Sequence, residues 1–507
     1  MVPNVVIKKW IWNGETIFFT IFASVMDTKA RFIVGRKNEL ETLNETLFSD
    51  ESQFIAVYGR RRVGKTFLIK RAFDGEFSFQ YTGLEKKSNR QQLEAFHLAL
   101  RQQGLPKCAK PKNWIEAFYQ LQNLLESKNG DIRNNNKKVI FLDELPWMDA
   151  PKAGFVEALG NFWNRWAAWT QDIVLIICGS ATSWMFNKVF RNHGGLYNRV
   201  TRQIPVNPFS LSECEQLSSR LGLGWTRLQI AEAYMIMGGI PHYWNKFDRK
   251  MSLVSNIDRL FFGNDADMTM EYKALYSSLF SNPEPYEAII EALAQKKRGL
   301  TRQEISELSG YDSSGRLTSI IENLELCGFI VKTTQPNKKS KDAIFQLVDN
   351  FSLFYHEFIR NKIKGSNYWS SNYMTPAHSA WSGLAFERLC FQHRTQIAKA
   401  LGISGIHAIW YAWSAPKTDS YPGVQVDMVI DRADGMVNLC EVKFTEEPFA
   451  ITPEYMQKLR LRRSRYQQEI ASKKGVHLTM VTSSGVVQNP QKFEINSFVT
   501  LDDLFAD

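Results

Sequence analysis

Apolar and polar residues along the chain form segments with two different periods. Residues 54–58 (FIAVY) and 139–142 (VIFL) are short continuous apolar runs, and a third run lies within residues 172–185. Runs of this kind are typical of strands buried in a parallel sheet. A helical pattern follows the first run, with Phe67, Leu68 and Ala72 on its apolar side. The first half of the chain is therefore predicted to be α/β.

Residues 283–347 show a different order of elements. Residues 285–299, 300–310 and 313–330 have helical patterns, and two short strands then flank the polar turn 333–342. Three helices followed by a wing predict a winged helix-turn-helix, in which the third helix enters the DNA major groove. On that helix, Arg316, Ser319 and Asn323 are expected to face DNA, and three lysines of the turn would lie near phosphates. Because the helix is not conspicuously basic, a module that docks domains together remains an equal alternative.

Residues 424–444 contain two strands that are predicted to pair around an Asp434–Gly435 turn. In the first strand, the apolar positions 424, 426, 428 and 430 should share one face, which places Asp427 on the other. In the second strand, Glu441 and Lys443 lie two residues apart and share a side. Two carboxylates and one amine are thus expected to converge on one face of a small sheet.

Composition adds three expectations. The net charge of +10 favours an acidic partner, and nucleic acid is the commonest one. The six cysteines lie far apart without metal-binding spacing, which predicts reduced core residues in a cytoplasmic protein. No apolar run reaches the roughly 20 residues needed to cross a bilayer, so no membrane partner is expected. Residues 1–29 are expected to be an unstructured extension, of which residues 1–25 are dispensable or precede the natural start.

The segment after the first strand fits the phosphate-binding motif G-x-x-x-x-G-K-[ST] in its strand-loop-helix context. Its glycines let backbone N–H groups curl around phosphates, Lys65 reaches the terminal phosphates, and the hydroxyl of Thr66 ligates magnesium. The residues expected to contact ATP are Gly59, Arg60, Arg61, Arg62, Val63, Gly64, Lys65, Thr66 and Phe67.

Acidic and polar residues follow the next two predicted strands. Asp143 is expected to hold Mg²⁺, and Glu144 to polarise the attacking water. Ser180, after the third strand, is the candidate sensor of the γ-phosphate. Arg199 or Arg202 is the candidate arginine finger, in cis or from a neighbouring subunit, with a solvated arginine as the alternative.

Six ordered motifs in residues 30–250 resemble those of the STAND-type, AAA-related ATPases of archaea and bacteria. They are VGRKNEL, GRRRVGKT, FLDELPWM, CGSATSWM, GGLYNRVT and GGIPHYW. The resemblance implies an α/β nucleotide-binding domain with a helical subdomain, acting as a nucleotide-dependent switch. It also implies that the segment containing VGRKNEL contacts adenine.

The C-terminal hairpin resembles the core of the PD-(D/E)XK nucleases, as Asp427 followed by Glu441-Val442-Lys443. The helical segment 381–393 resembles the first core helix of that superfamily and implies Glu387 as a third carboxylate. Carboxylates of this kind hold magnesium on a scissile phosphate, and the lysine stabilises charge. A helix with five basic residues follows and could grip a phosphate backbone. The usual proline before the aspartate is replaced by Val426, and no Gln-x-x-x-Tyr element follows, so an inactive nuclease fold used for binding is an alternative.

The predicted organisation is an N-terminal extension (1–29), a P-loop ATPase domain (30–210), a helical lid (211–280), a winged helix (281–360) and a restriction-endonuclease-like α/β domain (361–507). The predicted function is a Mg-dependent ATPase that couples nucleotide state to DNA binding or cleavage, with homo-oligomers possible. An ATP-switched regulator that binds DNA without cutting it, and a signalling scaffold, are the alternatives.

Overall fold

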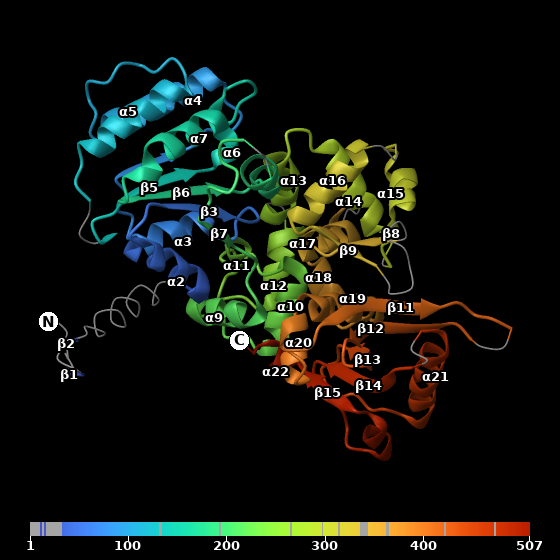
Figure 1. Cartoon of the computed structure of the whole chain (residues 1–507). Coiled ribbons are helices and arrows are strands. Elements are labelled where there is room, and N and C mark those ends of the chain that lie inside the picture. The colour runs from blue at the N-terminus through green and yellow to red at the C-terminus, as the bar shows by residue number, and fades with distance from the viewer. Residues whose placement is uncertain are drawn as a thin grey trace. The chain divides into compact units, whose positions relative to one another are not determined.

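The computed structural model describes residues 11–12, 15–16, 33–130, 134–191, 194–263, 266–296, 298–312, 315–334, 343–360, 365–419, 422–470 and 473–506. The three lysines of the turn 333–342 lie outside these residues. The chain divides into two compact units, Met1–Asn207 and Pro208–Asp507 (Figure 1).

Unit 1 is built on a five-stranded sheet in the order β4-β5-β6-β3-β7, with every neighbouring pair parallel. The central strands are almost entirely buried, which explains their continuous apolar sequences. The predicted α/β fold with a parallel sheet is therefore confirmed. The strands are β3 (Gln53–Tyr58), β4 (Phe79–Thr82), β5 (Lys138–Asp143), β6 (Ile173–Gly179) and β7 (Arg202–Pro205).

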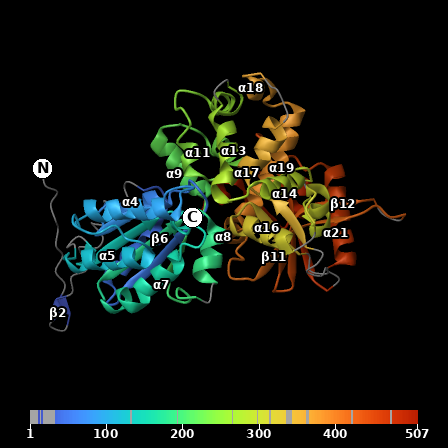
Figure 2. The ribbon, with the colours of Figure 1, turned by 90° about the horizontal axis from the view of Figure 1, so that it is seen from above.

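Helices cover both faces of this sheet (Figures 1 and 2). On one face lie α4 (Asn89–Gln102), α5 (Trp114–Glu126) and α7 (Phe155–Arg165), which share an aromatic core with the strands. On the other face lie α2 (Lys37–Glu45) and α3 (Lys65–Ala72). The short helix α6 (Leu145–Met148) follows β5, and α8 (Thr182–Trp184) follows β6.

Helix α3 buries a single stripe, at positions 65, 68, 69 and 72. Phe67 is 47% exposed, so its predicted place on the apolar side is wrong. The reason is geometric: at 3.6 residues per turn, residue 67 is rotated by about 100° from Leu68. The ring of Phe67 instead lies under the guanidinium of Arg71, 5.3 Å from it.

Unit 2 begins with a group of helices. They are α9 (Leu211–Leu221), α10 (Arg227–Met237), α11 (Pro241–Trp244), α12 (Leu253–Ile257) and α13 (Asp267–Leu279). Segments further along the chain pack onto α10. The carboxylate of Glu232 is 3% exposed, accepts a hydrogen bond of 2.9 Å from the hydroxyl of Tyr373, and lies 3.2 Å from Nε2 of His378.

The middle of unit 2 combines three helices with a three-stranded antiparallel sheet of order β8-β10-β9. Along the chain the elements are α14 (Glu284–Ala294), β8 (Leu300–Thr301), α15 (Arg302–Ser309), α16 (Gly315–Leu326), β9 (Ile330–Thr333) and β10 (Ile344–Leu347). On α16, Arg316 and Ser319 are exposed, which a position facing DNA requires. Asn323 is not, because its amide donates a hydrogen bond of 2.9 Å to the hydroxyl of Tyr286 on α14.

The C-terminal part of unit 2 carries a mixed sheet of order β11-β12-β13-β14-β15, antiparallel from β11 to β13 and parallel from β13 to β15. The strands are β11 (Ala408–Ala415), β12 (Val424–Arg432), β13 (Met436–Lys443), β14 (Gly475–Thr482) and β15 (Ser497–Thr500). The helices are α17 (Asn350–Phe354), α18 (Tyr368–Asn372), α19 (Pro376–Gln392), α20 (Arg394–Ala400), α21 (Pro453–Glu469) and α22 (Leu501–Leu504).

A β-bulge interrupts β12 at Asp427 and Met428. Tyr411 of β11 pairs with Val429 and Trp413 pairs with Val426, so β12 has one extra residue between these two pairs. The alternation therefore changes phase. Val426 and Val429 belong to one apolar cluster, and the predicted shared face of positions 424, 426, 428 and 430 is wrong.

Candidate functional site

The phosphate loop of unit 1 connects β3 to α3 through two glycines with positive φ. Gly59 has φ +148° and Gly64, the residue before α3, has φ +94°. Residues other than glycine rarely adopt such backbone angles. The loop therefore delivers the first N–H groups of an eight-residue helix to the end of a buried strand, which is the geometry of an anion site.

The ammonium of Lys65 is folded back onto the loop itself. It donates hydrogen bonds to the carbonyl oxygens of Gly59 (3.0 Å) and Arg60 (2.9 Å), and the side chain is 5% exposed. A buried cation held only by neutral carbonyls is well placed to turn toward a phosphate that enters the loop.

Thr66 and Asp143 meet at the start of α3. The hydroxyl of Thr66 donates a hydrogen bond of 2.9 Å to the carboxylate of Asp143, which ends β5 and is 5% exposed. A hydroxyl and a carboxylate side by side are hard oxygen donors of the kind that magnesium takes beside a nucleotide. The residues present thus fit a Mg-nucleotide at this loop.

Glu144 and Ser180 form a second pair at the ends of β5 and β6. The hydroxyl of Ser180 donates to the carboxylate of Glu144 (2.8 Å), and its backbone N–H lies 3.2 Å from the same oxygen. Glu144 adopts a left-handed conformation, with φ 48°. The sheet order makes β5 and β6 neighbours, and this brings together two side chains that lie 36 residues apart in the sequence.

The arginine candidates lie elsewhere in unit 1. Arg202 pairs in register with Ile55, four residues before Gly59, and Arg199 precedes the start of β7. Four residues of strand span about 13 Å, more than the reach of an arginine side chain. Within one chain, the structure therefore does not bring Arg199 or Arg202 to the phosphate loop. A role in trans stays a prediction.

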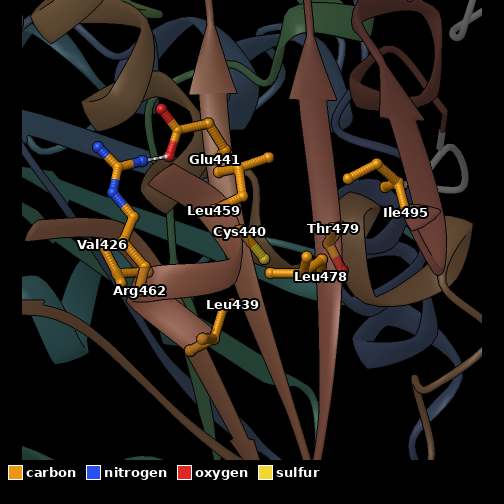
Figure 3. A pocket seen from close by; sticks show the side chains of 9 residues that line it. All are labelled: Val426, Leu439, Cys440, Glu441, Leu459, Arg462, Leu478, Thr479 and Ile495. Carbon is orange, nitrogen blue, oxygen red and sulfur yellow. Dashed lines mark hydrogen bonds and ion pairs between the residues drawn. The ribbon is translucent and has the colours of Figure 1, made fainter. Parts of the chain in front are cut away.

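The C-terminal carboxylates lie around β13. Glu441 is 4% exposed, and Lys443 lies 2.7 Å from its carboxylate. Two residues of α21, Tyr455 and Arg462, bind the same carboxylate, and Figure 3 shows the ion pair between Arg462 and Glu441 beside an apolar hollow. Sequence reasoning did not select Tyr455. Its spacing of seven residues from Arg462, which places both on one helix face, was the available signal.

The carboxyl groups of Asp427, Glu387 and Glu441 lie close enough for the charge of one to shift the pKa of another. Burial, together with the negative charge of Glu441, raises the pKa of Asp427 to about 6. Burial and the charge of Asp427 raise the pKa of Glu387, on α19, to about 7. Burial opposes the charge of Lys443, but the adjacent Glu441 outweighs this effect and raises the pKa of Lys443. One oxygen of Asp427 also accepts a hydrogen bond from the N–H of Val442 (3.1 Å).

These carboxylates are not arranged as a metal site. Over the residues that the structure describes, no group of three or more His, Cys, Asp or Glu side chains is placed to hold a metal ion. Since Lys443 and Arg462 already neutralise Glu441, the predicted set of Glu387, Asp427 and Glu441 does not fit a divalent ion as it stands.

Much of the basic helix α21 is occupied by internal ion pairs. Arg460 pairs with Glu494, Arg462 with Glu441, and Arg465, which is 4% exposed, with Glu469 at 2.5 Å. The predicted grip on a nucleic-acid backbone would therefore depend on breaking some of these pairs.

Two other expectations concern the whole chain. Among the described residues, no helix is both long and apolar enough to span a bilayer. All six cysteines are free thiols, and all but Cys108 are buried.

Residues 33–247 match a family model described as an ATPase domain predominantly from Archaea. An uncharacterized protein of Methanocaldococcus jannaschii is 28% identical over 337 residues, which cover 64% of this chain and 68% of that protein. An uncharacterized ATP-binding protein of the same organism is 46% identical over 43 residues, 8% of this chain and 73% of that protein. The chain thus contains an ATPase domain of this archaeal type.

Two solved structures align with parts of this chain. The Walker-type ATPase of Pyrococcus abyssi aligns over 64% of this chain and 96% of its own, with 17% identity and a TM-score of 0.45. The Aeropyrum pernix ORC2 protein, solved as ADPNP and ADP complexes, aligns over 64% and 93%, with 17% identity and a TM-score of 0.40.

Proposed function

We propose that the ATPase domain binds and hydrolyses Mg-ATP at the loop of residues 59–67 and uses the nucleotide state to control a DNA-directed C-terminal region. The observation that carries the first part is the hydrogen bond between Thr66 and Asp143. It joins the residue that follows Lys65 to the carboxylate at the end of β5, as a Mg-nucleotide site requires.

Each residue of the site has a separate task in this proposal. Lys65 leaves the carbonyls of Gly59 and Arg60 and binds the terminal phosphates. Glu144 orients the attacking water, and Ser180, its hydrogen-bond partner, senses the γ-phosphate. The chemistry that Mg²⁺ supplies at such a site is neutralisation of the charge on the phosphate oxygens.

Nucleotide binding is tested by calorimetry with Mg-ATP on the full chain. Lys65→Ala should weaken binding by at least about tenfold, because a buried charge-assisted contact to phosphate is lost. Lys70→Ala is the matched control, since Lys70 is an exposed lysine of the same helix and should leave the affinity unchanged. Equal affinities of the Lys65 variant and the parent protein would refute the assignment.

For the C-terminal region we propose a winged helix at residues 281–360 and a nuclease-like domain at residues 361–507. The order of three helices and two hairpin strands supports the first, although Asn323 faces α14 rather than solvent. The mixed sheet, with Asp427, Glu441 and Lys443 on adjacent strands, supports the second. The net charge of +10 suits DNA as a partner.

One observation favours a second candidate, an ATP-switched regulator that binds DNA without cutting it. Glu441 is already paired with Lys443 and Arg462, so its charge is already balanced without a metal ion. Labelled DNA incubated with Mg²⁺ and ATP separates the candidates, using the parent protein and the Asp427→Ala and Lys65→Ala variants. Cleavage that Asp427→Ala abolishes supports a nuclease, whereas binding without cleavage supports the regulator. A protein that neither binds nor cuts DNA would support a scaffold.

A further inference from the structure

Arg36 is a buried arginine at the N-terminus of α2, and it contacts two segments far from it in the sequence. The side chain is 6% exposed. Its Nη2 donates hydrogen bonds to the carbonyl oxygens of Val63 (3.2 Å) and Asn207 (2.6 Å), while Nη1 lies 3.3 Å from the carboxylate of Glu39. One guanidinium therefore joins the phosphate loop to the last residue of unit 1.

The other end of the phosphate loop touches the same terminal segment. The N–H of Val206 donates a hydrogen bond of 2.7 Å to the carbonyl of Tyr58, immediately before the loop. A Cβ placed on Gly59 would lie only 2.2 Å from the carbonyl oxygen of Val206. Val206 thus packs against the start of the loop, and Asn207 is linked to its end through Arg36. A movement of the loop should therefore displace both residues.

The bond from Arg36 to Val63 also sets the direction of one peptide group. A trans peptide is planar, so its N–H points opposite to its carbonyl. Because Arg36 holds the carbonyl of Val63, the N–H of Gly64 is turned away from Arg36 and left for an anion in the loop.

We propose that Arg36 is a positioning residue that orients the Val63–Gly64 peptide for phosphate and transmits movement of the loop to residues 206–207, where the chain leaves unit 1. The inference rests on the proposed function, because it assumes that the loop takes a nucleotide. It assigns the coupling between nucleotide and the rest of the chain to the contacts of Arg36. The predicted contact of the VGRKNEL segment with adenine does not account for this coupling.

Hydrogen exchange of the full chain with and without Mg-AMP-PNP tests the coupling. In the parent protein the nucleotide should slow exchange in a peptide covering residues 203–210 as well as in the phosphate loop. In Arg36→Ala, calorimetry should show affinity reduced by about tenfold, and at saturating nucleotide the response at 203–210 should be lost. Lys37→Ala, an exposed neighbour, should behave as the parent protein.

Arg36→Lys guards against a variant that fails to fold. It keeps the charge but lacks the planar fork that bonds the carbonyls of Val63 and Asn207 through one nitrogen and the carboxylate of Glu39 through the other. The response at 203–210 should therefore be reduced while far-UV circular dichroism is unchanged. A full response in either folded Arg36 variant would overturn the coupling alone. No AMP-PNP binding by the parent protein would instead overturn the proposed function.

Discussion

Replacement of Gly59 by alanine gives the sharpest test of how the phosphate loop is packed. The alanine Cβ would meet the carbonyl oxygen of Val206 at 2.2 Å, whereas carbon–oxygen contacts lie near about 3.3–3.6 Å. The loop or the end of β7 must therefore move by about 1 Å. The φ of +148° adds a conformational penalty of about 1–3 kcal/mol, and overpacking adds about 1–3 kcal/mol more.

Gly64→Ala is the matched control, because Gly64 also has positive φ but a Cβ there meets nothing within 4 Å. We expect Gly59→Ala to lower the free energy of unfolding of unit 1 by about 4 kcal/mol and Gly64→Ala by about 1–2 kcal/mol. In thermal denaturation these losses correspond to roughly 10 °C and 4 °C. Equal melting temperatures for the two variants would refute the claim that Val206 packs against the loop.

Three further predictions concern unit 2. The pKa of Glu387 is raised to about 7, so the folded state holds the proton of this carboxyl more tightly than the unfolded state does. The stability that this proton contributes is present below about pH 4.5 and is lost as the pH rises through 7. Glu387→Gln should therefore raise the melting temperature at pH 8 but not at pH 4.5, and a pH-independent effect would contradict this. Arg462→Gln should free Glu441 from one cation and increase Mn²⁺ affinity in calorimetry; an unchanged affinity would mean that this pair does not keep a metal out. Glu232→Ala should destabilise the fold by about 2–4 kcal/mol in chemical denaturation, because it removes a buried carboxylate that accepts a hydrogen bond from the half-buried hydroxyl of Tyr373. A loss below about 1 kcal/mol would show that water replaces the carboxylate.

The sequence predicted unit 1 well because local and global signals agree there. The apolar runs of β3, β5 and β6 are continuous since each strand is buried on both faces. Thr66 and Asp143 could be assigned to one site because the loop before Thr66 follows the end of β3, Asp143 ends β5, and the carboxyl ends of parallel strands lie at one edge of a sheet. Arg36 was not selected, because its partners are backbone carbonyls, which leave no pattern in side-chain sequence.

In unit 2, the predicted alternation of side chains between the two faces of β12 is interrupted by one extra residue. The extra residue at Asp427 and Met428 is stabilised by a bond between the Asp427 carboxylate and the N–H of Val442, and a period of two contains no sign of it. Spacing places Tyr455 and Arg462 on one helix face but could not show that both bind Glu441, because that depends on how α21 crosses the sheet. The sequence thus located the carboxylates and Lys443 but not the partners that α21 supplies.

The internal bonds of Lys65 have a consequence for selectivity. An incoming molecule must outcompete two carbonyl oxygens that already satisfy the ammonium, and only densely charged oxygens can do so. Adenosine, which offers a base and a sugar but no anionic group, leaves the lysine where it is. The loop should accordingly select ligands first by the charge of their phosphate groups and only then by the identity of their base.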